Sequence, residues 1–362
     1  MPELLKNYYN DTFVKSLGAI VKNTFTSFDL DAFCNAVIDM DWEAKELKER
    51  MRHITVTLHS FLPLSYPEQI NILKETSTKT EPGFYSMIFP DFVEVFGLNN
   101  WNISVSAMEF FTQTSSSEFA VRPFIIKDQE KMMNQMKQWS FHSNYHVRRL
   151  ASEGCRPRLP WAMALPALKK DPSPILPILE RLKSDPEEYV RRSVANNLND
   201  ISKDHPDLVI DLSKKWIGTS KDVDRVVKHA CRGLLKKQNK VVLKIFGFTD
   251  PGHISIKSFM IKNKKITIGD KLEFGFSLNT EQEQIGKVRL EYAIEYVKAN
   301  GKRSKKVFQI SESIIKDKLK DFTRVQSFKN MTTRKHYPGK HFISIIVNGE
   351  EKTKDSFILA GE

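Results

Sequence analysis

The spacing of apolar residues changes between residues 239 and 250, and this change restricts the possible folds more than any other feature. Before it, apolar residues recur at helical spacing, as in the run from Leu176 to Leu182. After it, they alternate with polar residues in short runs, which is typical of half-buried strands. A chain of 362 residues is also long for a single core. We therefore predict a helical domain over residues 1–244 and a β domain over residues 245–362.

A short motif recurs three times in the helical part. The copy "VRRLA" begins at Val147, "VRRSVA" begins at Val190, and the degenerate copy "VVKHA" begins at Val226. The copies are therefore 43 and 36 residues apart, and periods of roughly 40 residues with two helices per unit are typical of HEAT-type repeats. We favour an all-α solenoid of HEAT-like repeats, in which one helix of each pair lines a concave binding face. An irregular helical bundle, with a coincidental motif, remains the alternative.

Short alternating segments fill the C-terminal part. They begin with Ile254 and Ile256 and continue at residues 264–268, 272–278, 288–297, 307–310, 342–347 and 357–359. Turn signals separate them, namely Gly269-Asp270, Asn300-Gly301, Pro338-Gly339 and Asn348-Gly349. About seven short strands in ~110 residues fit an immunoglobulin-like β-sandwich. The predicted fold class is therefore multidomain α + β.

Positive charge is concentrated in the β domain. The chain has 56 basic and 44 acidic residues, a net charge of +12. Residues from 241 onward contribute 23 basic and 14 acidic side chains, so this last third accounts for +9 of the total. A polyanion such as DNA explains this asymmetry, because neutralising phosphates releases counterions. A basic surface without a specific partner is the alternative.

The sequence also indicates the compartment. No apolar run approaches the ~20 residues that a membrane span needs, and the first residues lack the apolar core of a secretory signal. The cysteines Cys34, Cys155 and Cys231 are odd in number and far apart, so they suggest neither a disulfide framework nor a zinc site. We expect a cytoplasmic, nucleoid-associated monomer without membrane contact, metal or cofactor.

Residues 145–162 form the most informative segment, with four arginines, a glutamate and a tryptophan around two prolines. The prolines cannot continue a helix. We therefore predict that a helix ends near Gly154, that a stiff basic loop follows, and that Trp161 enters the next helix. Arg149 and Glu153 are four residues apart and share a helix face. The alternative is a surface ion pair, a linker and a core tryptophan.

The run "RRLASEGCRPRLPW" at residues 148–161 closely resembles the AlkC family of bacterial DNA alkylation-repair glycosylases. Further stretches support the resemblance: "SSSEFAVRPFI" at 115–125, "VRRSVANNLNDISKDHP" at 190–206 and "TTRKHYPGKH" at 332–341. The resemblance covers nearly the whole chain, including a β domain found in one branch of the family. It implies HEAT-like repeats similar to those of the AlkD family, double-stranded DNA on a concave face, and excision of 3-methyladenine and 3-methylcytosine.

This implied chemistry requires carboxylates. A base such as 3-methyladenine is already positively charged and leaves as a neutral base, so no strong general acid is needed. The sugar becomes oxocarbenium-like, and an Asp or Glu can stabilise it or position water. Three acids match the family motifs: Glu118, Glu153 and Asp200. We expect Asp200 and Glu118 to face the lesion nucleotide and Glu153 to join them or to position water.

Two further residues complete the predicted catalytic set. Trp161 would supply an aromatic face, which attracts a positively charged base, and Arg149 would hold a carboxylate or touch a phosphate. Each assignment has a structural alternative: Glu118 could begin a helix, Asp200 could be a residue at the C-terminal end of a helix or in a turn, and Trp161 could be core. The resemblance also implies a lesion exposed at a kinked duplex, so we expect no deep base pocket.

Arginines suit phosphate contacts because their planar fork binds two oxygens at once. The candidates in the helical part are Arg148, Arg156, Arg158, Arg191 and Arg192. In the β domain Arg334, Lys335 and His336 belong to what we predict is a basic hairpin tip with Pro338-Gly339 at its turn. By resemblance, this domain would grip the DNA backbone on the minor-groove side opposite the helical body. The cluster over residues 302–306 is a weaker candidate, more typical of a solvated strand end.

Two other functions remain open at this stage. The first is a non-catalytic protein that binds damaged DNA or DNA structures on the same scaffold. The second is a protein–protein scaffold, because HEAT arrays commonly bind proteins. The presence of all three acids favours the enzyme, and since no lysine stands out as a lyase nucleophile, we expect a monofunctional glycosylase.

Overall fold

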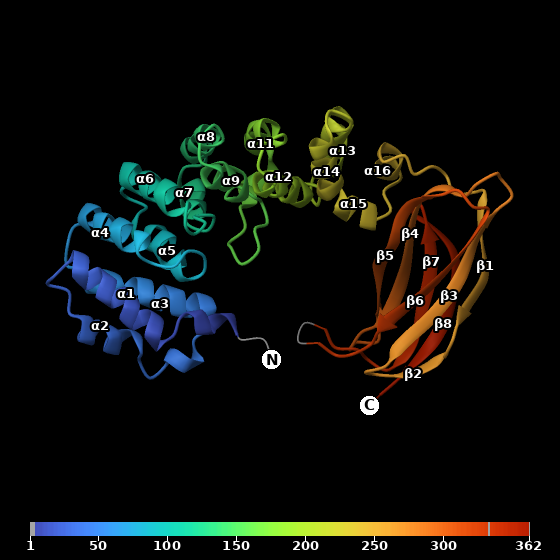
Figure 1. The fold of residues 1–362 in the computed structure, drawn as a ribbon, viewed down its shortest axis with the longest axis horizontal. Helices are drawn as coiled ribbons and strands as arrows, with labels where there is room; N and C mark the ends of the chain where they lie inside the picture. Colours follow the sequence, from blue (N-terminus) through green and yellow to red (C-terminus); the bar gives the residue numbers. More distant parts are fainter. Residues whose placement is uncertain (1–3, 332–333, 362) are drawn as a thin grey trace. The chain divides into compact units, whose positions relative to one another are not determined.

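The computed structural model describes residues 4–331 and 334–361 (Figure 1). The described residues form helices as far as Ile245 and strands from Ile254 onward, which confirms a helical N-terminal part and a C-terminal β part. No helix among them combines the length and apolar character needed to cross a membrane. The α-helices are α1 (Asp11–Thr24), α2 (Leu30–Val37), α3 (Leu47–Ser60), α4 (Tyr66–Thr78), α5 (Ile88–Phe96), α6 (Trp101–Phe111), α7 (Val121–Lys127), α8 (Gln129–Trp139), α9 (Tyr145–Glu153), α10 (Pro166–Lys170), α11 (Leu176–Leu182), α12 (Glu188–Ile201), α13 (Pro206–Trp216), α14 (Lys221–Ala230), α15 (Arg232–Lys236) and α16 (Lys240–Ile245). The strands are β1 (Ile254–Ile261), β2 (Lys265–Thr267), β3 (Lys271–Thr280), β4 (Gly286–Val297), β5 (Arg303–Ile315), β6 (Leu319–Ser327), β7 (Gly339–Val347) and β8 (Glu350–Ala360).

By packing, the chain divides into two compact units. The first comprises Met1–His205 and Gly218–Ala230, and the second comprises Pro206–Ile217 and Cys231–Glu362. Helices α13, α15 and α16 therefore group with the strands. The domain boundary that we expect between residues 244 and 245 remains a prediction.

In the first unit, helices pack on their neighbours along the chain. Helix α12 contacts both α9 and α14, and the three copies of the repeated motif lie on these three helices. Their first residues, Val147, Val190 and Val226, are all buried. The recurring motif thus places equivalent apolar residues in the interior of three successive packed helices. The assignment of these units to HEAT repeats remains an interpretation.

The second unit contains two β-sheets. One has the order β1-β3-β6 and the other the order β2-β8-β7-β4-β5, with β2 parallel to β8 and the other pairs antiparallel. Alternate residues of β3 point inward and are buried, including Leu272, Phe274 and Phe276. They join Ile294 and Ile345 from the other sheet in one apolar core. This arrangement is the expected sandwich of two sheets.

The sequence patterns miss one strand among the described residues. Strand β6 lies at an edge of its sheet, pairs only with β3, and has no fully buried residue. Its alternation is therefore weak, because an edge strand with mostly solvated side chains needs few apolar residues. Strand β5 is longer than predicted, and the basic cluster over residues 302–306 lies at its start.

The predicted hairpin at Pro338-Gly339 is wrong. Strands β6 and β7 flank this segment but belong to different sheets, so the chain crosses between the sheets and Pro338-Gly339 is not the turn of a hairpin between two paired strands. Gly339 begins β7, and its φ of 140° suits glycine. A single bridge joins Met331 to Arg334; the residues between them, at 332–333 of the "TTRKHYPGKH" motif, lie outside the described residues.

Candidate active site

Helix α9 ends where the prolines predict. Asn144 caps its start, because its Oδ1 accepts a hydrogen bond from the amide of His146 at 2.8 Å. Gly154 follows its last residue and allows a close approach to α7 and α8. A Cβ at this position would lie 2.5 Å from Val121 Cγ2 and 2.9 Å from Met136 Cε. The prediction that the helix ends near Gly154 is confirmed.

Trp161 does not enter the next helix, which begins at Pro166. It lies in the preceding loop with a φ of +64° and is 61% exposed. The core alternative for Trp161 is therefore wrong as well. A bulky residue in the left-handed region is strained, so the loop holds this ring on the surface against its local preference. The side chain of Lys48 donates a hydrogen bond to the carbonyl of Trp161 at 3.0 Å.

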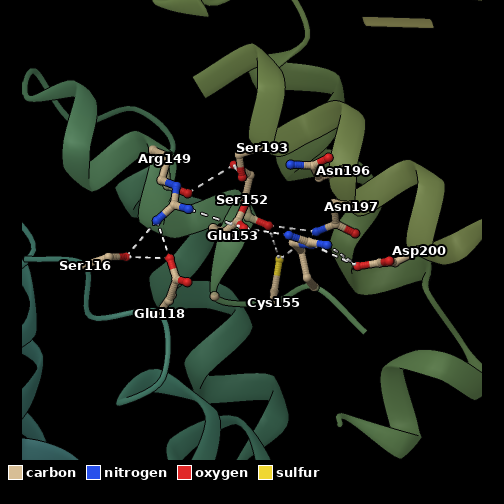
Figure 2. A network of polar contacts seen from close by, with 12 residues as sticks. Ser116, Glu118, Arg149, Ser152, Glu153, Cys155, Ser193, Asn196, Asn197 and Asp200 are labelled. Atoms are coloured by element: carbon tan, nitrogen blue, oxygen red, sulfur yellow. Dashed lines mark hydrogen bonds and ion pairs between the residues drawn. The ribbon is translucent and has the colours of Figure 1, made fainter. Parts of the chain in front are cut away.

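The three predicted acids meet in one chain of ion pairs (Figure 2). Arg149 pairs with Glu118 and also lies 3.3 Å from Glu153 Oε1. Arg156 continues the chain, with its guanidinium 2.6 Å from Glu153 Oε1 and 2.8 Å from Asp200 Oδ2. The acids come from the turn before α7, the end of α9 and the last turn of α12, so acids and arginines alternate across three segments of the fold.

Further polar contacts fix the two ends of this chain. Ser116 donates to Glu118 Oε2 at 2.8 Å and accepts from Arg149 at the same distance. At the other end, Lys203 donates to Asp200 Oδ1 at 2.9 Å. Both oxygens of Asp200 are therefore bound by cations, whereas Glu153 Oε2 is buried without a hydrogen-bond partner among the described residues.

Burial makes this network electrostatically strong. Only 5% of the Glu153 side chain and 3% of the Asp200 side chain are exposed, against 17% for Glu118. Burial disfavours the charged form of Arg149 and by itself would lower its pKa. The attraction of the neighbouring Glu153 and Glu118 carboxylates is larger, so the pKa of Arg149 is raised. Removing one member of a buried ion pair typically costs about 3–5 kcal/mol, because the partner stays buried and uncompensated.

An open hollow of about 360 Å³ borders the Glu118 end of the network. Its lining includes Glu118, Arg149 and Trp161, together with Tyr189 and Phe119. Arg149 lies over the ring of Tyr189, with 4.9 Å between the guanidinium carbon and the ring centroid. The hollow therefore combines one carboxylate with several aromatic faces, a lining that suits a flat, positively charged group. Sequence reasoning missed Tyr189, although it directly precedes a copy of the repeated motif.

The predicted phosphate-contact arginines differ in placement. Arg156 is 7% exposed and bound to two acids, so its burial corrects the expectation that it contacts DNA phosphates. Arg148 pairs with Asp185 at 2.6 Å and donates to the carbonyls of His142 and Ser143, so it serves local structure.

The other three arginines are more accessible or lie near a second hollow. Arg158 pairs with Asp204 at 2.7 Å and is partly exposed. Arg191 and the exposed Arg192 line a hollow of about 410 Å³ between α12 and α14, together with Arg225. Within the first unit, Arg192 is the predicted phosphate-contact arginine most open to solvent.

The three predicted DNA-contact residues in the β unit also differ in how exposed they are. Lys335 is exposed and Arg334 is partly exposed, 6.0 Å from the ring of Tyr296. His336 is only 6% exposed and packs on Phe328, with 5.1 Å between ring centroids. The expectation that His336 contacts DNA is thus corrected, because its ring belongs to an aromatic cluster in the interior.

Comparisons with known proteins agree with this architecture. Residues 114–225 match the family model "DNA alkylation repair enzyme", and residues 255–361 match the C-terminal Ig-like domain of "Uncharacterised protein YhaZ". The latter confirms the immunoglobulin-like prediction. The chain is 49% identical over 354 residues to "Uncharacterized protein YhaZ" of Bacillus subtilis, covering 98% of both proteins. It is 33% identical to the Pseudomonas fluorescens alkylpurine DNA glycosylase AlkC, solved bound to DNA containing an abasic site analog, with 99% of both chains covered and a TM-score of 0.95.

Proposed function

Because this chain belongs to the AlkC family of DNA alkylation-repair glycosylases, we propose that it is a monofunctional glycosylase that excises 3-methyladenine and 3-methylcytosine from double-stranded DNA. The single observation that best supports this activity is the chain of ion pairs that joins Glu118, Glu153 and Asp200 beside an aromatic hollow. Fixed carboxylates next to a cation-attracting surface are what N-glycosidic cleavage of a charged base requires.

The two ends of the network suit different tasks. Glu118 lines the hollow, so its carboxylate can stabilise the oxocarbenium-like sugar as the neutral base leaves. Glu153 has one oxygen without a partner among the described residues, which suits an acceptor that positions water for attack on the sugar. Asp200 has both oxygens bound and would act through Arg156 by holding it against Glu153.

The aromatic lining supports a preference for cationic bases. Trp161 is 61% exposed and Tyr189 is 42% exposed, and both line the hollow. A cation over an aromatic face gains about 0.5–2 kcal/mol, and a neutral undamaged base lacks this gain. An open hollow agrees with the expectation that no deep base pocket is needed.

We further propose that DNA lies along the inner helices α9, α12 and α14 of a HEAT-like array. Arg192 faces the second hollow from α12 and would contact the phosphate backbone, with Arg158 as a further candidate. In the β domain, proposed to span residues 245–362, Arg334 and Lys335 would add backbone contacts.

The test is release of free base from duplex DNA that contains either lesion, without added metal or cofactor. We expect release that leaves an intact abasic strand. Glu118→Gln should abolish release, because the neutral amide cannot stabilise a cationic sugar. The matched control is Glu295→Gln, because Glu295 is also partly buried, with 23% of its side chain exposed, and is bound by Lys354 at 2.5 Å in strand β4 of the second unit. Salt-sensitive DNA binding without release from the wild type would favour the non-catalytic binder instead.

A further inference from the structure

Arg122 is fully buried, although it belongs to none of the ion pairs of the site. It lies on α7 and has 0% exposure. Its guanidinium donates to three main-chain carbonyl oxygens: Nε to Met163 at 2.7 Å, and Nη1 to Gly154 and to Arg156 at 2.9 Å each. The remaining nitrogen, Nη2, has no hydrogen-bond partner among the described residues.

This placement is unfavourable for a cation. Burial lowers the pKa of Arg122 to about 10, which reflects the cost of removing the charge from water. Three carbonyl dipoles compensate part of that cost, without a carboxylate directly bound to the guanidinium in any contact described above. An apolar side chain would avoid the cost, so the gain must come from what the three hydrogen bonds hold in place.

The three carbonyls lie at the two ends of one loop. Gly154 and Arg156 begin the loop, Met163 lies near its end, before α10 begins at Pro166, and Trp161 lies two residues before Met163. The side chain of Arg156 binds Glu153 and Asp200, so fixing its main chain also fixes the centre of the ion-pair network. A loop with a strained φ at Trp161 needs such external support, because its local preferences oppose the conformation.

Arg122 also connects this loop to the segment that carries Glu118. It follows Glu118 by four residues, and these two positions lie about one helical turn apart across the start of α7. One buried side chain thus spans from the segment of Glu118 to both ends of the loop that presents Trp161.

We propose that Arg122 is a positioning residue, which fixes the loop between Gly154 and Met163. It thereby fixes the positions of Arg156 and Trp161 relative to Glu118. This role deepens the proposed glycosylase function and rests on it. Arg122 does not line either of the two hollows described at the site, so it acts through the loop and not on the DNA.

The first experiment compares Arg122→Met with a matched control, Arg50→Met. Arg50 is also a buried arginine, 3% exposed, which donates to the carbonyls of Tyr9 and Lys45 at 3.0 and 3.2 Å and pairs with Glu43 at 3.1 Å. None of these three partners lines the hollow beside Glu118. At a temperature at which both variants are folded, we expect Arg122→Met to lose about 100-fold in single-turnover excision, since a displacement of about 1 Å has effects of that size. Arg50→Met should excise at the wild-type rate, and both should bind abasic DNA within about threefold of the wild type.

A second readout does not depend on activity. Trypsin can cut the loop after Arg158, whereas the bond after Arg156 is protected by the following proline. We expect cleavage after Arg158, detected by mass spectrometry of the new terminus at Leu159, to be about tenfold faster in Arg122→Met than in the wild type or in Arg50→Met. Equal cleavage and equal excision in the two variants would overturn the proposal.

Two further measurements keep the proposal testable. If Arg122→Met does not fold, Arg122→Lys decides, because it retains the charge but not the planar fork; excision and trypsin cleavage both within twofold of the wild type would refute the role. In a Trp161→Ala background, Arg122→Met should cost much less than in the wild type, because coupled residues are not additive. Absence of base release by the wild type would refute the proposed function, while the trypsin comparison would still decide the role of Arg122.

Discussion

Trp161 allows the effects of ring loss and backbone strain to be separated. Its φ of +64° lies in the left-handed region, and its side chain is 61% exposed. Replacement by Ala or by Gly removes the same ring, but only Gly adopts this backbone without a steric penalty. We therefore expect Trp161→Gly to be more stable than Trp161→Ala, and both to excise more slowly than the wild type.

The expected difference in stability between the two variants follows from the backbone conformation at residue 161. A non-glycine residue in the left-handed region costs about 1–2 kcal/mol, and glycine loses about 0.5–1 kcal/mol through the greater freedom of the unfolded chain. At the midpoints of these two ranges, the net advantage of Gly over Ala is about 0.75 kcal/mol. For a domain of this size that difference shifts the melting temperature by about 1–4 °C.

The assays are urea unfolding and single-turnover excision on the same preparations. Trp139→Ala serves as the control for a core tryptophan, because Trp139 is 2% exposed and donates from Nε1 to Glu109 at 2.7 Å; it should lose about 3–5 kcal/mol of stability. An equal or lower stability of Trp161→Gly relative to Trp161→Ala would refute the strain argument. Excision at the wild-type rate in both variants would remove Trp161 from the proposed site.

Three further predictions concern the ion pairs, the basic segment and the histidines. Asp200→Asn should abolish excision while binding of abasic DNA survives, because the neutral amide no longer balances Arg156; near-normal turnover would remove Asp200 from the mechanism. The double variant Arg334→Gln/Lys335→Gln should reduce the slope of log affinity against log salt by about 1.8, or about 0.9 for each lost phosphate contact, and an unchanged slope would show that these residues do not contact phosphate. Burial lowers the pKa of His336 and of His341 below the ordinary value of 6.5, so the unfolded chain takes up protons before the folded one, and the free energy of unfolding of the β unit should fall as pH decreases below about 6.5. Urea unfolding at pH 7.5 and 5.5 checks this, and His341→Phe should weaken the dependence; a free energy that is equal at both pH values would contradict it.

Local sequence was sufficient to predict those features that depend on a residue's own backbone or on its near neighbours in the chain. The prolines after Gly154 end α9 whatever surrounds them, and the alternation over residues 272–278 marks β3 because one face of a strand must be buried. The acids Glu118, Glu153 and Asp200 could be named from motifs that resemble a known family. Their meeting in one network could not be derived from spacing, because Arg156 and Asp200 are 44 residues apart.

The sequence by itself thus determined the helical and β parts and the break after α9, and it indicated the three acids that we propose for the site. Only the tertiary structure decided that Arg156 is a buried bridge, that Trp161 is exposed in a strained loop, and that Arg122 binds both ends of that loop. The reason is physical: helix ends and strand alternation depend on neighbouring residues, whereas the burial of a charge depends on partners that distant segments bring to it.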